Sequence, residues 1–502
     1  MLIKNGLVMR PDGTAAPLDI RVEDGRIAEL GQFDGMPPAA SGEPVLDARD
    51  RLIAPGLINT HNHSNENYFK GLFDNLPLEL WLLFSYPVMG APPQNPRQVY
   101  IRTMLGCMEM LKRGCTAVVD FLYEMPETTV ESVAAVLQAY IDSGMRVLLC
   151  IGYADKVYYE TTPLAMDLLT PELKAQIDAT PLLSPEENIA FVDIVRQIWD
   201  GRENRVAIGL GPSGPQRCSD RQLELSAAYA TQHDLRIHIH TLETKMQAFS
   251  GQLYYGKTII EHLADLKFLS PRVHLNHAIW LTERDIDLVA ASGAGTTHNL
   301  LSNFKLGSGI SPVPEMLAKG INVSLGTDGK SSNDSQDMYE VLKAVALLHK
   351  TQLPEFQEWL GAPEAWRMAT SNGAAALGLA GESGEIAVGR RADLVLFDLN
   401  TIPFTPLNNP LHQLVYCLPS HVVDTVLVEG QVVVSQGRLT RIDETAILAE
   451  GQELGQEFVA ANQPTWEIAR ALFPSVAAGY RHAVTQDVGV NRYLRPQGGG
   501  HD

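Results

Sequence analysis

The 502-residue sequence has few cysteines, no long apolar run and too few basic residues to balance its acids. Its five cysteines are odd in number and never form a Cys-x-x-Cys pair, which argues against a disulfide framework and indicates reduced thiols. No stretch approaches the ~18 uninterrupted apolar residues of a membrane helix. The first ten residues contain only a short apolar fragment, too short for a secretory signal. We therefore expect a cytoplasmic protein.

The charge balance excludes two classes of partner. Lys and Arg number 39 against 59 Asp and Glu, so the formal net charge is −20. Nucleic acids and anionic membranes both require a basic footprint on the protein that binds them. With 45% hydrophobic and 20% charged residues, the composition is that of an ordinary globular protein. We expect a small-molecule partner, with no nucleic acid and no membrane.

Both ends of the chain have the pattern of β structure. Leu2–Met9 is a predicted strand, and alternating segments flank the Asp24-Gly25 turn. The pattern returns at Ala392–Asp398 and in a hairpin around Glu429-Gly430. These ends predict one small β-sandwich domain composed of residues 1–58 and 380–445.

The middle of the chain alternates predicted strands and helices, which favours a (β/α)8 barrel over residues 59–379. The eight predicted strands are 53–60, 116–121, 146–153, 206–211, 236–241, 273–278, 295–299 and 322–327. The last long helix of this region is expected over 334–350, with Ser331, Ser332 and Asn333 as candidate N-caps.

Two segments fall outside the regular alternation of the barrel. Segment 155–204 is longer than an ordinary crossover, and we expect it to add helices over the barrel mouth. The tail, 446–502, is a predicted helical extension that ends near residue 480 and is frayed over 497–502.

Histidines and acids gather where the predicted strands end, which is the face that carries the site of an α/β barrel. His61 and His63 follow the first strand and point to the same face, so both can bind one ion. His238, His240 and Glu243 end the fifth strand. An HxH pair alone is weak evidence, since chance and core packing also produce it.

Each of these positions also has an ordinary structural explanation. Glu243 suits a helix N-terminus, where an acid complements the dipole, and His238 suits a bracing role inside the barrel. His277 ends the sixth strand, with His274 on the opposite face. Asp328 ends the eighth strand, although an Asp-Gly pair after a strand is often just a turn. Four such elements in barrel order do not share one structural explanation easily.

Taken together, these motifs resemble the metal-dependent amidohydrolase superfamily. The resemblance is carried by Pro55–His63, His238-x-His240-x-x-Glu243, His277 and Gly326-Thr327-Asp328-Gly329, and it covers about residues 1–445. Within the superfamily the chain is similar to methylthioadenosine/S-adenosylhomocysteine deaminases, guanine deaminase and the triazine (atrazine-type) hydrolases.

The resemblance implies a metal-dependent aminohydrolase. His61, His63, His240 and Asp328 would bind one divalent ion, zinc or alternatively iron, which activates a water. Asp328 and His277 would take the proton of that water, and Glu243 would protonate the ring nitrogen beside the attacked carbon. The expected substrate is a small nitrogen heterocycle, namely a purine, pterin, triazine or nucleoside-like compound.

Two departures bear on the expected substrate and metal count. The fourth strand and its ends, 205–212, have no lysine to bridge a second metal, which argues against a hydantoinase-like enzyme. Related adenosine deaminases often have a Trp-Pro-x-Glu run that can hold sugar hydroxyls. Residues 85–90 here read Ser-Tyr-Pro-Val-Met-Gly, without the acid.

The resemblance leaves several features open. Trp81 is a candidate to stack on a flat substrate ring or, alternatively, a core residue. The resemblance also implies a homo-oligomer, a dimer or larger. The alternatives to deamination are loss of chloride, an alkylamine or a thiol, and amide-type hydrolysis on the same metal site. A catalytically silent metal-binding barrel is disfavoured, because such a protein needs neither Glu243 nor His277.

Overall fold

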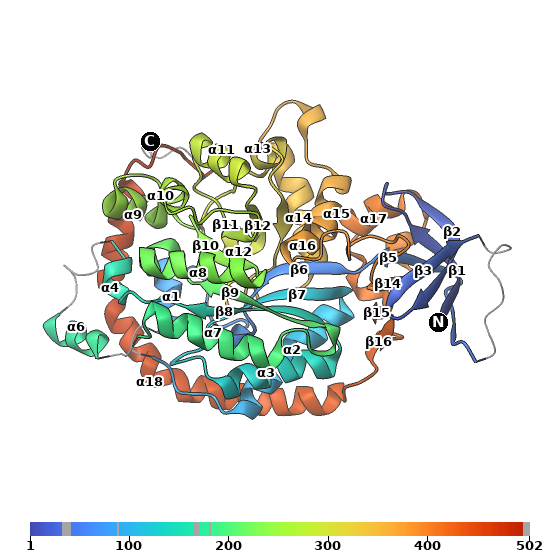
Figure 1. The fold of residues 1–502 in the computed structure, drawn as a ribbon, viewed down its shortest axis with the longest axis horizontal. Coiled ribbons are helices and arrows are strands. Elements are labelled where there is room, and N and C mark those ends of the chain that lie inside the picture. Colours follow the sequence, from blue (N-terminus) through green and yellow to red (C-terminus); the bar gives the residue numbers. More distant parts are fainter. Residues whose placement is uncertain (33–41, 88–89, 164–169, 180–181, 495–502) are drawn as a thin grey trace.

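The computed structural model describes residues 1–32, 42–87, 90–163, 170–179 and 182–494. Its larger part is a sheet of eight parallel strands that curls into a nearly closed barrel (Figure 1). The strands in order are β6 (Leu57–Asn62), β7 (Cys115–Leu122), β8 (Arg146–Tyr153), β9 (Val206–Pro212), β10 (Ile237–Thr241), β11 (Val273–His277), β12 (Gly295–His298) and β13 (Val323–Leu325). The predicted α/β barrel is confirmed.

The last barrel strand meets the first through hydrogen bonds at their ends. The N–H of Asp328 donates to the carbonyl of His61 at 2.9 Å, and the hydroxyl of Thr60 donates to the carbonyl of Leu325 at 2.8 Å. The ends of strands β6 and β13, which carry predicted site residues, are therefore joined directly.

The two ends of the chain build a second, mixed sheet beside the barrel, at the right of Figure 1. Its strands are β1 (Leu2–Met9), β2 (Ala15–Glu23), β3 (Arg26–Gly31), β4 (Val45–Asp47), β5 (Arg51–Pro55), β14 (Leu394–Asp398), β15 (Val423–Val428), β16 (Gln431–Ser435) and β17 (Arg438–Leu439). The antiparallel pair β5–β14 joins the N-terminal strands to the C-terminal ones. The predicted β unit from both termini is confirmed, while its residue boundaries stay a prediction.

The prediction of one strand over 53–60 is wrong, because this segment belongs to two strands in the structure. Strand β5 ends at Pro55 in the terminal sheet and β6 begins at Leu57 in the barrel. Gly56 lies between them, and a Cβ there would stand 2.2 Å from Oγ1 of Thr116. Only glycine fits this close approach at the point where the chain passes from one sheet to the other.

The helix expected at 334–350 begins later, and its expected N-caps are wrong. Helix α14 spans Met338–Leu348 and is capped by Asp337, which accepts from the N–H of Tyr339. The side chains of Ser331 and Asn333 are engaged elsewhere, with Glu66 and with the carbonyl of Thr327. Long-range partners therefore removed both residues from helix capping.

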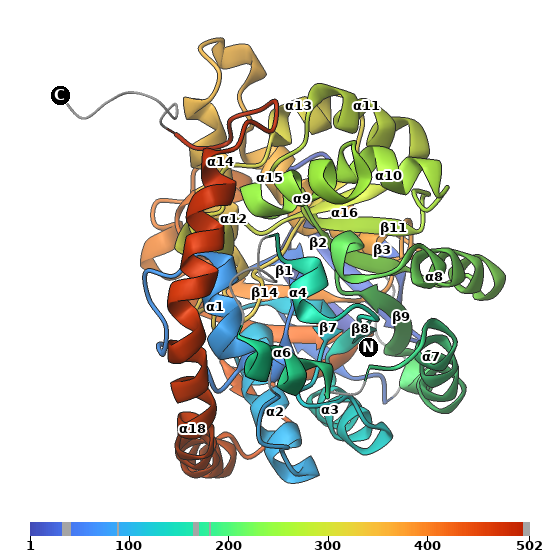
Figure 2. The same ribbon diagram turned by 90° about the vertical axis from the view of Figure 1, so that its left-hand side faces the viewer.

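The C-terminal tail is a single long helix, α18 (Glu444–Thr485), and the predicted frayed end lies outside the described residues. Figure 2 shows α18 alongside α1 (Leu78–Ser85), and it also contacts α2 (Pro96–Lys112). The indole N–H of Trp466 donates to the carbonyl of Phe84 at 3.0 Å. The tail thus supports α1 from outside.

The insert 155–204 divides between two positions. Thr161 of α4 (Tyr158–Thr161) and Ile177 of α6 (Pro171–Asp178) line the pocket at the barrel mouth. Helix α7 (Pro185–Trp199) instead packs against β9 and α8 (Asp220–His233), as an ordinary crossover helix does. Among the described residues, the insert contributes to the pocket lining through the part that precedes α7.

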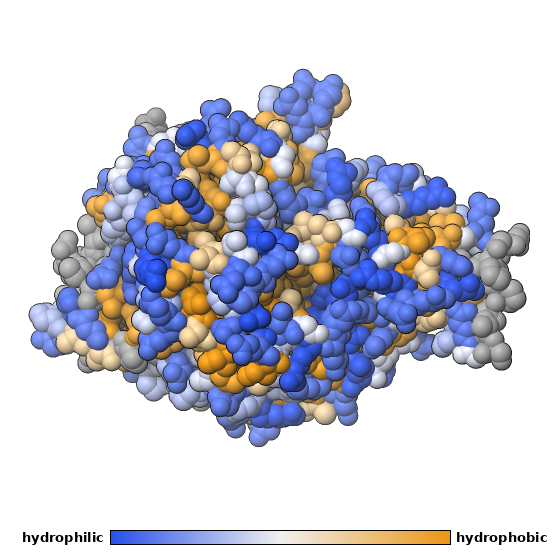
Figure 3. Space-filling model, in the orientation of Figure 1, coloured by the Kyte–Doolittle hydropathy of each residue, from blue (hydrophilic) through white to orange (hydrophobic). Residues whose placement is uncertain are grey.

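The surface has the polar character of a globular protein. The face in Figure 3 is mostly hydrophilic, with hydrophobic side chains in scattered patches. Among the described residues, no helix combines the length and the apolar character that crossing a bilayer requires.

A buried ion pair joins the barrel to the terminal sheet. Arg146, at the start of β8, places Nη2 3.3 Å from Oδ1 of Asp393 and 3.4 Å from Oε2 of Glu429. Burial raises the pKa of Asp393, but Arg146 and the hydrogen bonds to the carboxylate bring it below its ordinary value. Loss of the guanidinium would leave that buried carboxylate without its counter-charge.

Arg146→Met is therefore expected to lower the free energy of unfolding by about 3 kcal/mol. Arg97→Met is the matched control, because Arg97 pairs with Glu450 on the exposed surface and should cost less than about 1 kcal/mol. Denaturant unfolding of both variants checks this. Equal costs for the two variants would contradict a structural role for the buried pair.

Candidate active site

One pocket opens at the carboxyl ends of the barrel strands and collects the residues that the sequence singled out. It encloses about 1360 Å³ of space between atoms, its open mouth included. The predicted site residues that line it are His63, Trp81, His240, Glu243, His277 and Asp328. His61 lies beneath them, fully buried.

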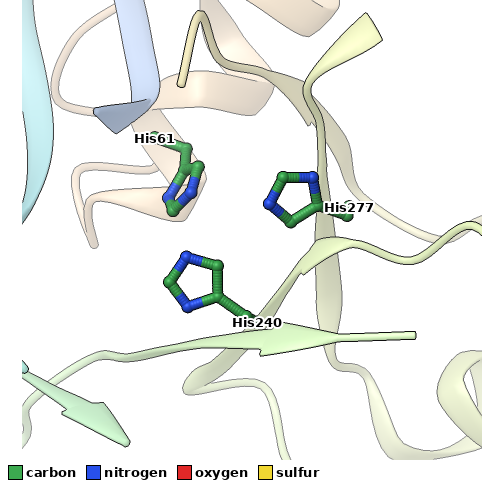
Figure 4. A group of neighbouring side chains, drawn as sticks. All are labelled: His61, His240 and His277. Atoms are coloured by element: carbon green, nitrogen blue, oxygen red, sulfur yellow. The ribbon is translucent and has the colours of Figure 1, made fainter. Parts of the chain in front are cut away.

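Three imidazoles and one carboxylate converge at the floor of this pocket. Oδ1 of Asp328 lies 3.5 Å from Nε2 of His61 and 3.3 Å from Nε2 of His63. Nε2 of His240 lies 3.3 Å from Nε2 of His63. Figure 4 shows the rings of His61, His240 and His277 turned toward a common space. Three nitrogens and an oxygen so arranged form a typical ligand set for a transition metal.

Hydrogen bonds behind two of the rings set their tautomers. Nδ1 of His63 lies 2.8 Å from the carbonyl of Phe121, and Nδ1 of His240 lies 3.0 Å from the carbonyl of Ser213. A carbonyl only accepts, so each Nδ1 carries the proton and each Nε2 presents its lone pair to the cluster. His61 has no hydrogen-bond partner for either ring nitrogen among the described residues. A cation would satisfy these buried nitrogens.

The local charge also favours a cation. Burial lowers the pKa of His63, but its hydrogen bond to Asp328 and the charge of Glu66 outweigh that effect and raise the pKa to about 9. Burial would raise the pKa of Asp328, yet the surrounding imidazoles hold it well below its ordinary value. The two carboxylates therefore stabilise positive charge at this position, and the residues fit a divalent metal.

Glu66 is a buried acid that the sequence prediction missed. Its carboxylate accepts hydrogen bonds from the hydroxyls of Tyr86 and Ser331. The segment His61-x-His63-x-x-Glu66 repeats the spacing of His238-x-His240-x-x-Glu243. This repeated spacing is the sequence signal that could have identified Glu66. A Cβ on Gly329 would stand 1.9 Å from Glu66, so the turn after β13 needs glycine there.

His277 lies between two carboxylates. Its Nε2 is 3.7 Å from Oε2 of Glu243 and 3.9 Å from Oδ2 of Asp328. Its Nδ1 is 2.9 Å from Oδ1 of Asn303, which orients the ring. His277 and Asp328 adopt φ values of 70° and 67°, a strained conformation for residues other than glycine. Such strain is typical of functional sites held in place by their surroundings.

Glu243 is buried, and its side chain is directed into the pocket. Burial raises its pKa from an ordinary 4.5 to about 7, while the charge of His277 opposes the rise. Thr244, not Glu243, caps the following helix α9 (Lys245–Tyr255). Glu243 is therefore not the residue that caps this helix, and its carboxyl lies in the pocket instead.

Trp81 is a core residue that also reaches the pocket. It lies in α1 and packs with Leu78 and Leu306 while it lines the pocket. Its indole N–H donates to the carbonyl of Ser331 at 3.3 Å. Its ring lies 5.8 Å from that of Tyr86 between centroids, and the two planes are tilted by 58°. Its contact with a substrate stays a prediction.

His238 and His274 lie away from the pocket lining. Their rings stack at 5.2 Å between centroids, and Nε2 of His238 lies 3.3 Å from the carbonyl of Ala376. Both are buried inside the barrel. Both histidines therefore lie where a bracing role inside the barrel was expected, away from the pocket.

Comparison with known proteins gives the family. Residues 52–433 match the model of the amidohydrolase family. A 5'-deoxyadenosine deaminase of Methanosarcina barkeri is 34% identical over 469 residues, which cover 91% of this chain and 98% of that protein. A 5-methylthioadenosine/S-adenosylhomocysteine deaminase of Desulforudis audaxviator is 32% identical, covering 91% of this chain and 99% of that protein.

A solved structure supports the same grouping. The crystal structure of an adenosine deaminase from Xanthomonas campestris, with bound zinc, superposes with a TM-score of 0.80 at 27% identity. The superposition covers 91% of this chain and 98% of that chain. The resemblance expected from the strand-end motifs is therefore confirmed.

Because the pKa of Glu243 is raised in the folded state, the free energy of unfolding should decrease as pH rises. The protonated carboxyl stabilises the folded state fully below pH 4.5, and this contribution is lost as pH rises through about 7. After removal of metal by a chelator, Glu243→Gln should therefore gain stability over the unchanged protein as pH rises. The gain should reach about 3 kcal/mol above about pH 8. Denaturant unfolding across pH measures it, and a pH-independent difference would contradict the assignment.

Proposed function

This chain belongs to the amidohydrolase family, and from that premise we propose that it hydrolytically deaminates a small nitrogen heterocycle with the help of one divalent metal ion. A single observation carries the proposal. The buried pair Glu243–His277, an acid with a pKa near neutrality beside an oriented imidazole, faces the same pocket as the metal-type cluster. His277 could also act as a metal ligand, since it groups with His61 and His240, but binding a metal alone would not require Glu243.

We propose that His61, His63, His240 and Asp328 hold this ion. When bound, a divalent cation acts as a Lewis acid and lowers the pKa of a water to about 7. Zinc is the metal we favour, since it accepts nitrogen and oxygen ligands in this number and is the ion bound in the Xanthomonas campestris deaminase. Iron accepts the same ligands.

The protein's own acids and bases would then transfer the protons. Asp328 and His277 accept a proton from the attacking water, whose oxygen bonds to the ring carbon that bears the amine. Protonated Glu243 donates to the adjoining ring nitrogen and so draws electrons from that carbon. As the carbon–nitrogen bond breaks, the attached oxygen gives its remaining proton to Glu243 and becomes a carbonyl. The amine takes up the proton held by Asp328 and His277 and leaves as ammonia.

A pKa near neutrality suits Glu243 to the role of proton donor. A carboxyl with a pKa of about 7 is protonated in a large fraction of molecules at neutral pH, yet it gives up its proton readily. Trp81, which lines the pocket, would stack on the substrate ring. The location in the cytoplasm and assembly into a dimer or larger oligomer stay predictions.

The test is ammonia release by zinc-reconstituted protein from purines, pterins, triazines and nucleosides. Glu243→Gln should retain near-stoichiometric zinc and lose at least about 100-fold in kcat, whereas His61→Ala should lose both metal and activity. Glu186→Gln, a change at an exposed carboxylate on α7, is the control and should keep both.

Two outcomes would overturn parts of this proposal. A Glu243→Gln variant that keeps most activity on the true substrate would indicate a leaving group that needs no proton, such as chloride. Failure of the unchanged protein to bind near-stoichiometric metal on reconstitution would contradict the metal site itself.

A further inference from the structure

The turn after the fourth barrel strand carries two polar side chains that the mechanism does not use. Strand β9 ends at Pro212, and the short turn Pro215–Arg217 follows it. Gln216 and Arg217 of this turn line the same pocket as Glu243 and His277. Both also line a smaller adjoining cavity, together with Glu79. The turn therefore adds an amide and a guanidinium to the pocket lining.

Arg217 has a positive charge without a carboxylate partner among the described residues, since none of their carboxylates lies within 4.0 Å of its guanidinium. Its side-chain hydrogen bond is to Oγ of Ser213 at 3.3 Å. Its charge lowers the pKa of both Glu243 and Glu79, which places it near two buried acids without pairing with either. Most of its five N–H donors are thus available to a ligand.

Gln216 has a buried amide oxygen without a hydrogen bond. The residue is 4% exposed, and Oε1 has no partner among the described residues. A buried polar atom left unpaired costs about 1–3 kcal/mol, and such atoms in folded proteins have a reason. Because this amide lines the pocket, a bound ligand is the partner that would satisfy it.

We propose, building on the deaminase function above, that Gln216 and Arg217 recognise a cyclic amide edge of the substrate ring. Arg217 donates to the ring carbonyl, and Gln216 accepts from the adjoining ring N–H. A neighbouring donor and acceptor on the protein complement the acceptor and donor of a –NH–C(=O)– edge. The substrate class is therefore an amino-oxo heterocycle.

The proposal separates this chain from its nucleoside-deaminating relatives. The base of a 5'-deoxyadenosine has neither a ring carbonyl nor a ring N–H, so it lacks the amide edge that would pair with Gln216 and Arg217 together. Residues 85–90 also contain no carboxylate for sugar hydroxyls. A site built for a hydrogen-bonding group rejects a ligand that lacks the group far more strongly than an apolar site rejects an extra methylene.

Matched pairs of compounds test the inference on the zinc-loaded full chain. Guanine and 2-aminopurine, pterin and 2-aminopteridine, and isocytosine and 2-aminopyrimidine each share the attacked carbon and the amine but differ in the cyclic amide. We expect kcat/KM to favour the amide-bearing member by at least about 10-fold. Arg217→Met should reduce that preference to less than about 3-fold, and Arg217→Lys should restore only part of it.

Arg221→Met is the control, since it removes the same charge from an exposed pair with Glu186 and should keep the preference. Circular dichroism and zinc content show whether each variant is folded. Equal use of both members by the unchanged enzyme, or a preference that survives in Arg217→Met, would overturn the inference while leaving deamination intact.

The two proposals can fail separately. If no compound releases ammonia, the deaminase proposal fails, and calorimetric binding of the same pairs still decides the inference. Tighter binding of the amide-bearing members that Arg217→Met abolishes would support it. Equal binding of both members would overturn it.

Discussion

The contact between Asp328 and His61 is the constraint on which the rest of the site depends. The N–H of Asp328 donates to the carbonyl of His61 and joins the eighth barrel strand to the first, while its carboxylate lies 3.5 Å from the imidazole of the same residue. This pair of residues thus joins the ends of the barrel sheet and also supplies two of the four proposed metal ligands. A Cβ on Gly326 would stand 2.8 Å from Cβ of His61, so this closure tolerates no side chain there. The contacts that join the eighth strand to the first therefore also bring Asp328 and His61 together in the cluster.

The floor of the site could be predicted because it follows from strand geometry. His61, His63, His240, His277 and Asp328 all stand at strand ends, and parallel strands bring their carboxyl ends to one face. The remaining features depend on tertiary contacts. Strands β5 and β6 separate at Gly56 because of Thr116, and Ser331 binds Glu66 instead of capping α14. Gln216 and Arg217 line the pocket from a short turn. The path of this turn could not be predicted, because it follows no hydrophobic periodicity in the sequence.

The parts around the barrel act on the pocket through physical contact. Helix α18 packs on α1, and α1 carries both Trp81 and Glu79 to the pocket walls. On the opposite side, Arg146 and Asp393 fix the terminal sheet to the start of β8. The buried acids, imidazoles and strained residues at the centre are costly to fold. The large apolar core of the barrel and these outer supports offset that cost.

The coordination of the bound metal tests the central claim most directly. X-ray absorption at the zinc edge of the reconstituted protein should show only nitrogen and oxygen neighbours at about 2.0–2.2 Å. Asp328→Ala should remove a carboxylate oxygen from that shell or abolish binding. A sulfur neighbour at about 2.3 Å, or an unchanged spectrum in the Asp328→Ala variant, would contradict a site built by His61, His63, His240 and Asp328.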